Sequence, residues 1–434
     1  MKRAFISLTA LALVATPWFG MPQAYAAPTA PAQLRGSLPH GGSYVIRADP
    51  TLRAAAIELW FRAPASGYRN RTPGLGQLAA VSAAAAKLVS GISLVNLVRS
   101  VGGRLSVNVY PDIIGVGAVV PSGAARRVVA AMTAAYFAPR IDESALEMAK
   151  RDAAVLVVES HFSSARLLHD ALFARIFAHG PAHYPALPGS VTSFATLALT
   201  PVQTYARRAF RSGNGLLVLT GNVSPAVLSA VTDGRPGRAD VPIDSPLARS
   251  PRSGDVDGTG TGIGLAWVGP SIRHQRAATA MDFIADYLFR DGTGTVQRSL
   301  TNDDVSLEGQ FITLHHPGVM LVTLSGPASN LARRRISSAL AALRKPLPEA
   351  AFEAAKTAFV YHVQSDTQTL RDLADNLGWY AVEGNPSYAP GDASRTYLRT
   401  AAHLDPAFVA GVVRRYLSKP VTVRIISPKK GTAS

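Results

Sequence analysis

The chain has 434 residues, of which 47% are hydrophobic and 17% charged, so it can bury sizeable cores and is not a disordered polymer. Its formal net charge is +16, but the arginines and lysines are scattered along the chain. The densest runs of arginine, at 69–71 and 333–335, are not accompanied by a stripe of aromatic residues. We therefore predict no nucleic-acid partner despite the basic charge. The absence of cysteine excludes disulfide bonds.

Residues 1–26 have the pattern of a secretory signal peptide. Lys2 and Arg3 precede an apolar run, and an Ala-x-Ala cleavage site follows at 24–26. The run is short and contains Pro17, which argues against a membrane-spanning helix, and no later apolar run approaches about 18 residues. We expect a secreted protein, periplasmic or extracellular, without a transmembrane anchor.

The sequence that follows contains an internal repeat with an offset of about 205 residues. Four segments recur in the same order: an apolar strand, a hairpin with proline in its turn, a leucine-spaced helix, and a helix followed by a terminal strand. In the last helix of each copy, Thr200 and Asp405 are the predicted N-caps, each followed by a proline. The paired segments are 57–64 with 263–270, 102–123 with 306–327, 160–181 with 365–386, and 200–210 with 405–417.

A segment rich in Gly, Pro, Asp and Ser lies between the copies and predicts an exposed linker over 234–262. We therefore expect an N-terminal domain over 27–233 and a C-terminal domain over 263–431. Because each copy mixes strand and helix patterns, the predicted fold class is α+β. It would consist of two duplicated domains, each a mostly antiparallel or mixed sheet with helices packed on one face.

The order and spacing of these segments resemble the pitrilysin/insulinase family of zinc metallopeptidases, particularly the branch of the mitochondrial processing peptidase. Gly74-Leu75 opens a segment similar to the family's helix G-[LT]-A-H-[FL]-L-E-H, and residues 98–112 resemble its G-G-x-x-N-A-x-T-x-x-D segment. Residues 154–168 look like the helix that carries a distal glutamate ligand, and residues 177–223 resemble the family's h-P-Y-x-x-P stretch and the helix after it. The resemblance covers nearly the whole mature chain and implies the family's two-domain fold.

The resemblance also implies that the family's zinc site is lost. In the family, H-x-x-E-H supplies two histidine ligands and a general base on one helix, and a distal glutamate completes the ligand set. The first histidine, the base and the second histidine correspond here to Gln77, Ala80 and Val81, and the whole stretch 41–160 contains no histidine. Only the distal position is filled, by Glu159, and a single carboxylate cannot hold catalytic zinc.

A second site of the family is altered as well. There, an arginine and a tyrosine hydrogen-bond the substrate backbone and the developing oxyanion. The corresponding positions are Thr301 and Glu308, or Arg298 and Val305 in an alternative register. Neither register preserves the pair.

No pair of histidines offers a substitute metal site. Gly-Pro between His179 and His183 breaks a helix, so these side chains cannot share one helical face. His315 and His316 are adjacent near a hairpin turn, and neighbouring residues of a strand point to opposite faces. Two further histidines lack ligand-type neighbours in the sequence: His169 and His274.

We therefore predict an exported, non-catalytic subunit of an insulinase-type metallopeptidase. It is expected to bind no cofactor itself and to pair with a homologous zinc-bearing subunit, so that the two chains enclose an extended peptide substrate. Two alternatives remain open: a stand-alone peptide- or protein-binding module of the same fold, and an active peptidase whose site the sequence does not reveal. The sequence contains neither the G-x-S-x-G motif of serine hydrolases nor a Walker-type loop.

Overall fold

The computed structural model describes residues 33–38, 41–64, 72–161, 163–177, 190–237, 251–315, 317–383 and 393–426, except the side chains of 159–161 and 393–395. Several predictions of the sequence analysis lie outside these ranges and stay predictions. They concern the signal peptide, residues 238–250 of the linker, His179, His183 and His316.

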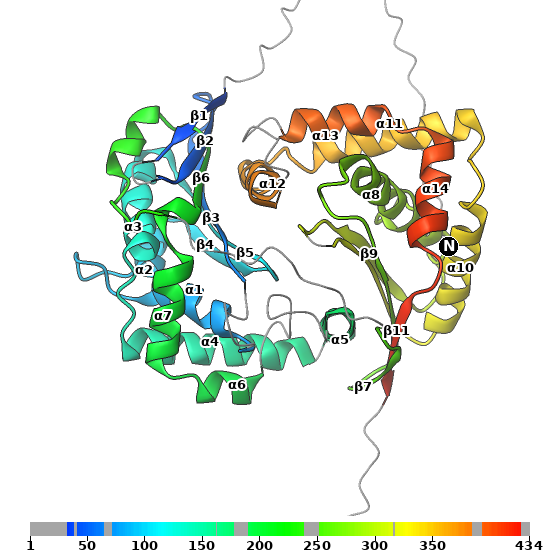
Figure 1. Ribbon diagram of the computed structural model, residues 1–434, viewed down its shortest axis with the longest axis horizontal. Helices are drawn as coiled ribbons and strands as arrows, with labels where there is room; N and C mark the ends of the chain where they lie inside the picture. Colours follow the sequence, from blue (N-terminus) through cyan, green and yellow to red (C-terminus); the bar gives the residue numbers. More distant parts are fainter. Residues whose placement is uncertain are drawn as a thin grey trace, which may run out of the picture.

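Two mixed β-sheets form the centres of two halves of the chain (Figure 1). The first sheet has the order β1-β2-β6-β3-β5-β4, antiparallel except for the parallel pair β2–β6. The second has the order β7-β11-β8-β10-β9, antiparallel except for the parallel pair β7–β11. The strands are β1 Gln33–Ser37, β2 Ser43–Ala48, β3 Ala54–Arg62, β4 Arg104–Val109, β5 Ile113–Pro121, β6 Gly215–Gly221, β7 Gly254–Asp257, β8 Gly262–Val268, β9 Ser306–Ile312, β10 Val319–Ser325 and β11 Val421–Ile426.

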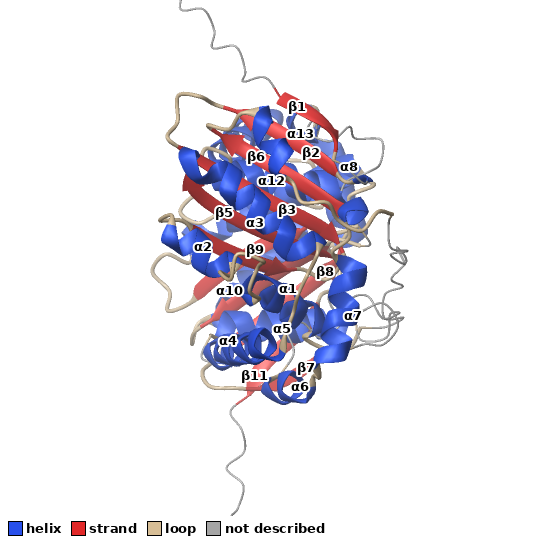
Figure 2. Cartoon of the chain, turned by 90° about the vertical axis from the view of Figure 1, so that its left-hand side faces the viewer, coloured by secondary structure: helices blue, strands red, loops and turns tan. Residues whose placement is uncertain are grey.

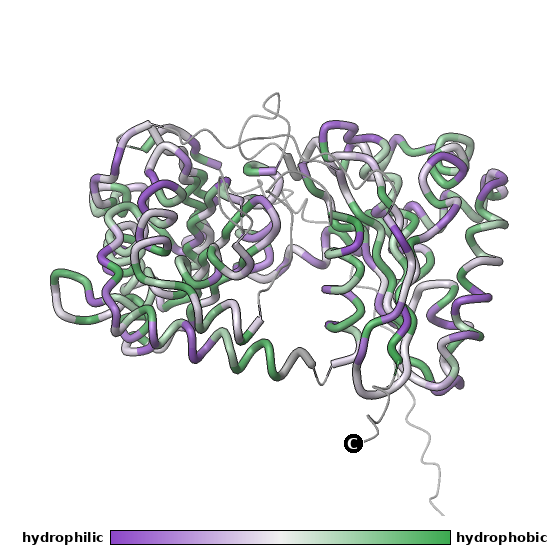
Figure 3. The backbone as a smooth tube through the Cα atoms, turned by 60° about the horizontal axis from the view of Figure 1, so that its bottom comes forward, coloured by the Kyte–Doolittle hydropathy of each residue, from purple (hydrophilic) through white to green (hydrophobic). Residues whose placement is uncertain are grey.

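Helices are layered against both sheets (Figure 2). Figure 3 shows the two halves side by side, with hydrophobic and hydrophilic stretches alternating along their helices, as expected of amphipathic surface helices. The helices are α1 Leu75–Ala85, α2 Leu94–Ser100, η2 Ser122–Ala124, α3 Ala125–Phe137, α4 Glu143–His161, α5 Ser164–Ile176, α6 Val191–Thr196, α7 Leu199–Ala209, η3 Ser212–Asn214, η4 Pro225–Ala230, α8 Gln275–Phe289, α9 Thr295–Ser299, α10 Ser329–Ala342, α11 Glu349–Ser365, α12 Leu370–Glu383, α13 Ala393–Ala402 and α14 Pro406–Tyr416.

The predicted α+β fold with duplicated domains is confirmed. The first strand of the repeat is β3 in one half and β8 in the other, and the predicted hairpins are β4–β5 and β9–β10. The terminal helix and strand are α7 and β6 in the first half, and α14 and β11 in the second.

The central strand β3 is buried on both faces, which gives it an almost continuous run of buried residues. Ile57, Leu59 and Phe61 face the first hydrophobic core, together with residues of α1, α3 and α7. Ala56 and Trp60 point the other way, into a second cluster that contains Ala374 and Leu377 of α12. Glu58 shares their parity in the strand and is 4% exposed.

The two halves exchange one helix each, so that each sheet is covered on its second face by a helix from the other half (Figure 1). Helix α5 belongs to the first half, but Leu168 and Leu172 pack against Val319 and Leu321 of the second sheet. Helix α12 belongs to the second half, but packs on β3 and β6 of the first sheet. The two exchanged helices are the third repeated segment of the sequence, 160–181 and 365–386.

One of the two N-cap predictions is confirmed and the other is wrong. The Asp405 carboxylate accepts a hydrogen bond of 2.7 Å from the backbone N–H of Phe408 and caps α14. Helix α7 instead begins at Leu199, with Ala198 at the N-cap and no side-chain cap, so Thr200 lies inside the first turn. Leu199 packs against the first core, which favours the earlier start, and Pro201 is tolerated because N–H groups of a first turn have no helical partner.

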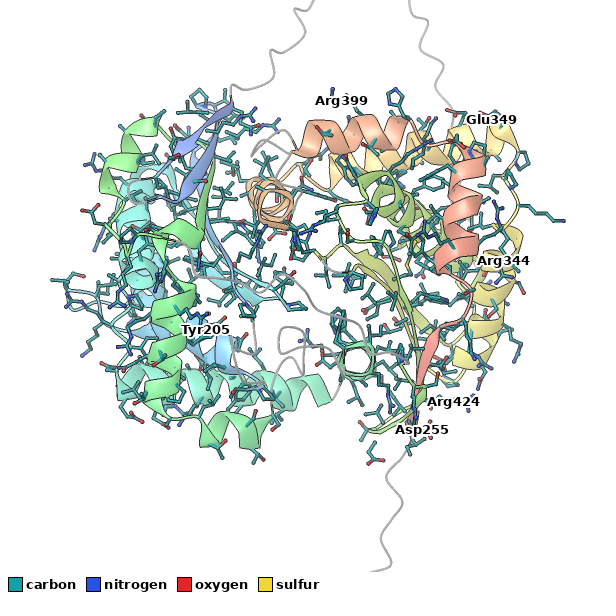
Figure 4. All side chains as sticks on the ribbon, in the orientation of Figure 1. Tyr205, Asp255, Arg344, Glu349, Arg399 and Arg424 are labelled. Atoms are coloured by element: carbon teal, nitrogen blue, oxygen red, sulfur yellow. The ribbon has the colours of Figure 1, made fainter. Side chains whose placement is uncertain are left out.

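Strand β7 lies inside the segment expected to be a linker. Its parallel pairing with β11 places Asp255 beside Arg424 at one end of the second sheet (Figure 4). The guanidinium of Arg175 on α5 donates to the carbonyl of Asp255 at 2.8 Å, so β7 also helps to hold the exchanged helix. No helix within the described ranges is long and apolar enough to cross a membrane.

Candidate functional site

Helix α1 carries the three positions that the resemblance assigned to the zinc helix. Gly74 precedes it with a φ of 79°, and a β-carbon there would come within 2.2 Å of the Phe194 ring, so only glycine fits. Ala80 is fully buried, while Gln77 and Val81, four residues apart, are half-buried on one side of the helix. The helix begins where the sequence predicts it and is packed mainly through alanine and leucine.

Tyrosine hydroxyls hydrogen-bond to this helix and to the chain just after β3. Tyr136 of α3 is fully buried and donates a hydrogen bond of 2.8 Å to the carbonyl of Ala80. Tyr205 of α7, labelled in Figure 4, donates one of 2.9 Å to the carbonyl of Pro64. Burial raises the pKa of the Tyr136 hydroxyl, which therefore stays a donor at any ordinary pH. The surroundings of Ala80 are those of a packing position.

The residues of α1 do not fit a zinc ion. Ala80 and Val81 have no donor atoms, and an amide such as that of Gln77 is not among the usual zinc ligands. Glu159 lies on α4, but its side chain is outside the described residues. Among the side chains that the structure describes, no three His, Asp or Glu are grouped closely enough to hold a metal ion.

The second predicted site is dispersed. Thr301 lies exposed in the turn after α9, where its hydroxyl donates to the carbonyl of Arg298 at 3.0 Å. Glu308 lies exposed on β9, beside a hollow of about 390 Å³ that Arg166 and His169 of α5 also line. Glu308 has no donor group when ionised, and the Thr301 hydroxyl already donates to a backbone carbonyl, so the two residues do not replace the arginine and tyrosine of the family.

The described histidines have structural partners. His169 on α5 stacks on Phe173 and lies 3.0 Å from a carboxylate oxygen of Asp170. His274 precedes α8 and lies 3.4 Å from the Ser271 hydroxyl. His315 follows β9 and takes part in the junction between the two halves.

At that junction, side chains from both halves contact the backbone carbonyls at the C-terminal end of α12. Nδ1 of His315 lies 3.2 Å from the carbonyl of Glu383, and Nε2 lies 2.9 Å from the guanidinium of Arg273. The guanidinium of Arg62 on β3 donates to the carbonyl of Val382. The last carbonyls of a helix have no partner within the helix. Here the Arg62 guanidinium of the first half and the His315 ring of the second half are their partners.

The Glu383 side chain is buried in this junction and is 1% exposed. Burial, with the neighbouring Asp112 as a second cause, raises the pKa of its carboxyl well above the usual range, while Arg62 opposes the shift.

A feature that the sequence did not predict is a cavity of about 720 Å³ between the two halves. Its walls come from the exchanged helices α5 and α12, from α8, α11 and α13, from the turn after β4, and from the free side of β9. Because β9 is the last strand of its sheet, its outer backbone edge faces this cavity. Such an edge can accept another extended chain as an added strand.

A carboxyl–aromatic cluster lies beside the cavity, which its residues Tyr110 and Trp379 line. The Trp60 indole N–H donates a 2.9 Å hydrogen bond to a carboxyl oxygen of Glu58. Burial, with the nearby Asp375 as a second cause, raises the pKa of Glu58 to about 8, so this acid is protonated at neutral pH. Tyr110 stacks on Trp60 at 6.4 Å and meets Trp379 edge to face at 4.7 Å. The two tryptophans and the tyrosine bring the first sheet and α12 together.

A further acid with a tyrosine partner lines the cavity. Asp282 on α8 accepts a hydrogen bond of 2.9 Å from the Tyr397 hydroxyl. Burial raises the pKa of Asp282 to about 8 despite that hydrogen bond. Apart from His169, no residue that lines the cavity was singled out from the sequence, because the exchange of α5 and α12, which creates the cavity, leaves no local signal.

Comparisons with known proteins agree with the fold. Similar solved structures include a protease from Helicobacter pylori, with a TM-score of 0.79 and 14% identity over 92% of this chain and 100% of that one. A putative M16-like peptidase from Alicyclobacillus acidocaldarius has a TM-score of 0.75 and 16% identity over 92% and 98% of the two chains. A peptidase M16 inactive domain from Pseudomonas fluorescens has a TM-score of 0.75 and 15% identity over 92% and 99%.

These neighbours establish the fold of M16, or pitrilysin-type, peptidases for this chain. No family model matches the sequence, and no curated protein matches it. One of the neighbours is itself described as an inactive domain. The fold expected from the order of the sequence segments is thereby confirmed.

Proposed function

We propose that this chain is an exported, non-catalytic subunit that pairs with a zinc-bearing homologue and helps to enclose a peptide during proteolysis. The observation that carries the proposal is that helix α1 has no zinc ligands at the three positions of the family motif. The peptidase fold is complete, yet Ala80 is fully buried and Gln77 and Val81 offer no histidine to a metal. A fold kept without its chemistry supports a holding or assembling role.

Export rests on the sequence of the first 26 residues. A charged start, an apolar run and an Ala-x-Ala site are the parts of a signal peptide, with cleavage after Ala26. We propose a periplasmic or extracellular location. In such a compartment, zinc would be held by the partner, and this chain would contribute walls and a strand edge.

The peptide-holding part of the proposal is supported by β9 and the cavity beside it. The free edge of β9 offers backbone donors and acceptors, and a volume of about 720 Å³ lies next to it. Strand addition uses backbone hydrogen bonds for affinity and side-chain pockets for selectivity. An extended peptide is the ligand that this arrangement suits.

The test is reconstitution with a homologue from the same organism that carries H-x-x-E-H. We expect the two purified chains to form a complex of fixed stoichiometry and the homologue to cleave peptides faster within it than alone. As a control, Glu→Gln at the base of the homologue's motif should abolish cleavage and leave the complex intact. A homologue that is fully active alone and forms no complex with this chain contradicts the subunit role.

A second candidate is a stand-alone peptide-binding module. The observation in its favour is that both halves of this one chain already line the cavity. In that case the isolated chain binds peptides with full affinity, and addition of the zinc-bearing homologue changes neither binding nor cleavage.

A further inference from the structure

Two helices of the second half end beside each other on the outer side of the molecule. The guanidinium of Arg414, in the last turn of α14, donates a hydrogen bond of 2.6 Å to the carbonyl of Arg344, just after α10. Figure 1 shows both helices at the edge of the second half that is turned away from the first half. We call the surface at these two helix ends the α10–α14 face. Its basic residues are Arg344, Lys345, Arg414, Arg415 and Lys419.

The basic residues of the α10–α14 face have no acidic partner. All five residues are exposed, and none forms an ion pair within the part of the chain that the structure describes. Elsewhere in the same half cations do pair, as Arg276 does with Asp405 at 2.6 Å and Lys356 with Glu353 at 2.7 Å. The positive charge of the α10–α14 face is therefore concentrated and unbalanced.

The sequence keeps acids away from this face. Neither residues 329–348 nor residues 406–434 contain Asp or Glu. The next acid after Arg344 in the chain, Glu349, begins α11 and lies apart from Arg344 in Figure 4. Two stretches that are distant in the sequence thus contribute cations to one surface without contributing a carboxylate.

Helix dipoles account for only a small part of this arrangement. The C-terminal end of a helix carries a partial charge of about −0.5, which attracts cations. Arg414 and Arg415 lie in the last turn of α14, and Arg344 and Lys345 follow the C-cap of α10. Two helix ends therefore offset roughly one of the five positive charges. The rest of the positive charge is available to an external anion.

The position of these cations favours an extended anion over a small one. None of the five basic residues lines the two hollows described above. A small anion is usually held in a concave site by a few converging groups, whereas these cations lie at two helix ends and in the turn after α14. Tyr416 is half-buried, and the Arg415 guanidinium lies over its ring at 5.2 Å. Tyrosine is enriched at the boundary between membrane and water.

From this geometry we infer that the α10–α14 face binds the phosphate-bearing headgroups of an anionic membrane surface. Clusters of about four to eight Lys and Arg on a helical surface typically bind such lipids. The exported location proposed above provides such a surface, and no nucleic acid is expected there. Because the face lies on the outer side of the second half, a bound chain keeps its cavity and its first half free (Figure 1). The inference goes beyond the proposed function, which needs no membrane.

The experiment measures binding of the full mature chain to sedimented vesicles. One set of vesicles contains phosphatidylcholine with about 30% phosphatidylglycerol, and the other contains phosphatidylcholine alone. We expect the partition coefficient to be at least about ten-fold higher for the anionic vesicles at low salt. The difference should disappear at roughly 1 M salt, where the Debye length is only about 3 Å.

A triple variant tests whether the α10–α14 face is the binding surface. Lys345→Gln, Arg415→Gln and Lys419→Gln together remove three charges and leave the hydrogen bond between Arg414 and Arg344 in place. Each cation near an anionic surface contributes about five-fold to binding. Binding to the anionic vesicles should therefore fall by at least about 30-fold.

The matched control is the triple variant Arg126→Gln, Arg127→Gln and Arg140→Gln, which removes the same charge from exposed positions on and after α3. It should lower vesicle binding by less than about three-fold. Equal losses in the two triple variants would mean that binding follows the net charge, and would overturn the inference. Equal binding of the two vesicle sets by the unaltered chain, or binding to a short DNA duplex and not to vesicles, overturns it as well. None of these outcomes affects the proposed function, because reconstitution with the zinc-bearing homologue contains no membrane.

Discussion

The backbone of Gly378 lies directly on the indole of Trp60: a β-carbon at position 378 would come within 2.0 Å of the indole nitrogen. Gly378 belongs to α12 of the second half, and Trp60 to β3 of the first. The exchange has a counterpart, because a β-carbon on Gly264 of β8 would come within 2.7 Å of Leu172 of α5. Glycine at these contacts lets each exchanged helix lie close to its sheet.

Gly378→Ala should therefore destabilise the protein by about 1–3 kcal/mol, because the new methyl group overlaps a rigid, buried ring. Gly411→Ala is the matched control on α14, where the nearest atom to a new β-carbon is Arg414 Nη2 at 3.8 Å. That control should be neutral or stabilising by up to about 1 kcal/mol, because alanine has the higher helix propensity. Urea unfolding of both variants measures the difference, and equal midpoints would be inconsistent with close packing of α12 on Trp60.

The exchange of helices also predicts that the halves stay together after the chain is cut. A protease site inserted within residues 238–250 and cleaved after folding should leave two fragments that elute as one species. The buried residues that bind them include Leu172 on one side and Leu377 on the other. Leu377→Ala should weaken this association, since deleting a buried leucine typically costs about 2–5 kcal/mol. Separation of the unaltered fragments under native conditions would refute the exchange.

Glu58 gives the stability of the protein a definite pH dependence. Its pKa rises from 4.5 to about 8 in the folded state, so the folded state holds the proton more tightly than the unfolded state. Stability from this group is complete below pH 4.5 and declines as the pH rises towards 8.

Glu58→Gln removes the ionisation and keeps an oxygen for the Trp60 N–H. We expect the variant to be more stable than the unaltered protein by roughly 4 kcal/mol at pH 8 and by less than about 1 kcal/mol at pH 5. Thermal unfolding across pH 5–8 measures this, and a stability difference that does not change over that range speaks against a neutral Glu58.

Helix α1 should resist conversion into a zinc helix. Ala80→Glu places a carboxylate where the exposed fraction is zero, so it should cost more than about 3 kcal/mol. Gln77→Glu introduces the same group at a half-buried position in the first turn, where the helix dipole favours it, and should change stability by less than about 0.5 kcal/mol. Guanidinium unfolding of the two variants provides the comparison, and an Ala80→Glu protein as stable as Gln77→Glu would mean that position 80 is not a packing position.

Much of this fold could be predicted from the sequence because many of its elements depend on residues that are close together in the chain. The hairpins β4–β5 and β9–β10 and the capped helix α14 follow from alternation, turn prolines and Asp405, which are neighbours in the chain. The duplication also gives the order of the repeated elements, and that order indicates the fold. The prediction for Thr200 failed because packing of Leu199 against the core outweighed a weak capping preference.

The cavity could not be predicted, because its walls meet only through long-range packing. Glu58 and Asp375 are far apart in the sequence, and no sequence pattern near either residue indicates that they lie close together in the fold. The pattern 365–386 indicated a helix with leucine spacing, but the same spacing suits a helix on either sheet. Which sheet it covers depends on the fit of Gly378 to Trp60, and that is a property of three-dimensional packing.

The central claim, that this chain does not carry out zinc-dependent proteolysis by itself, is tested most directly by one measurement on the purified mature protein. Zinc content is determined by elemental analysis together with the rate of peptide cleavage before and after chelation. We predict substoichiometric zinc and no cleavage that a chelator abolishes. One zinc per chain with chelator-sensitive cleavage, lost in a Glu159→Gln variant, would contradict the account.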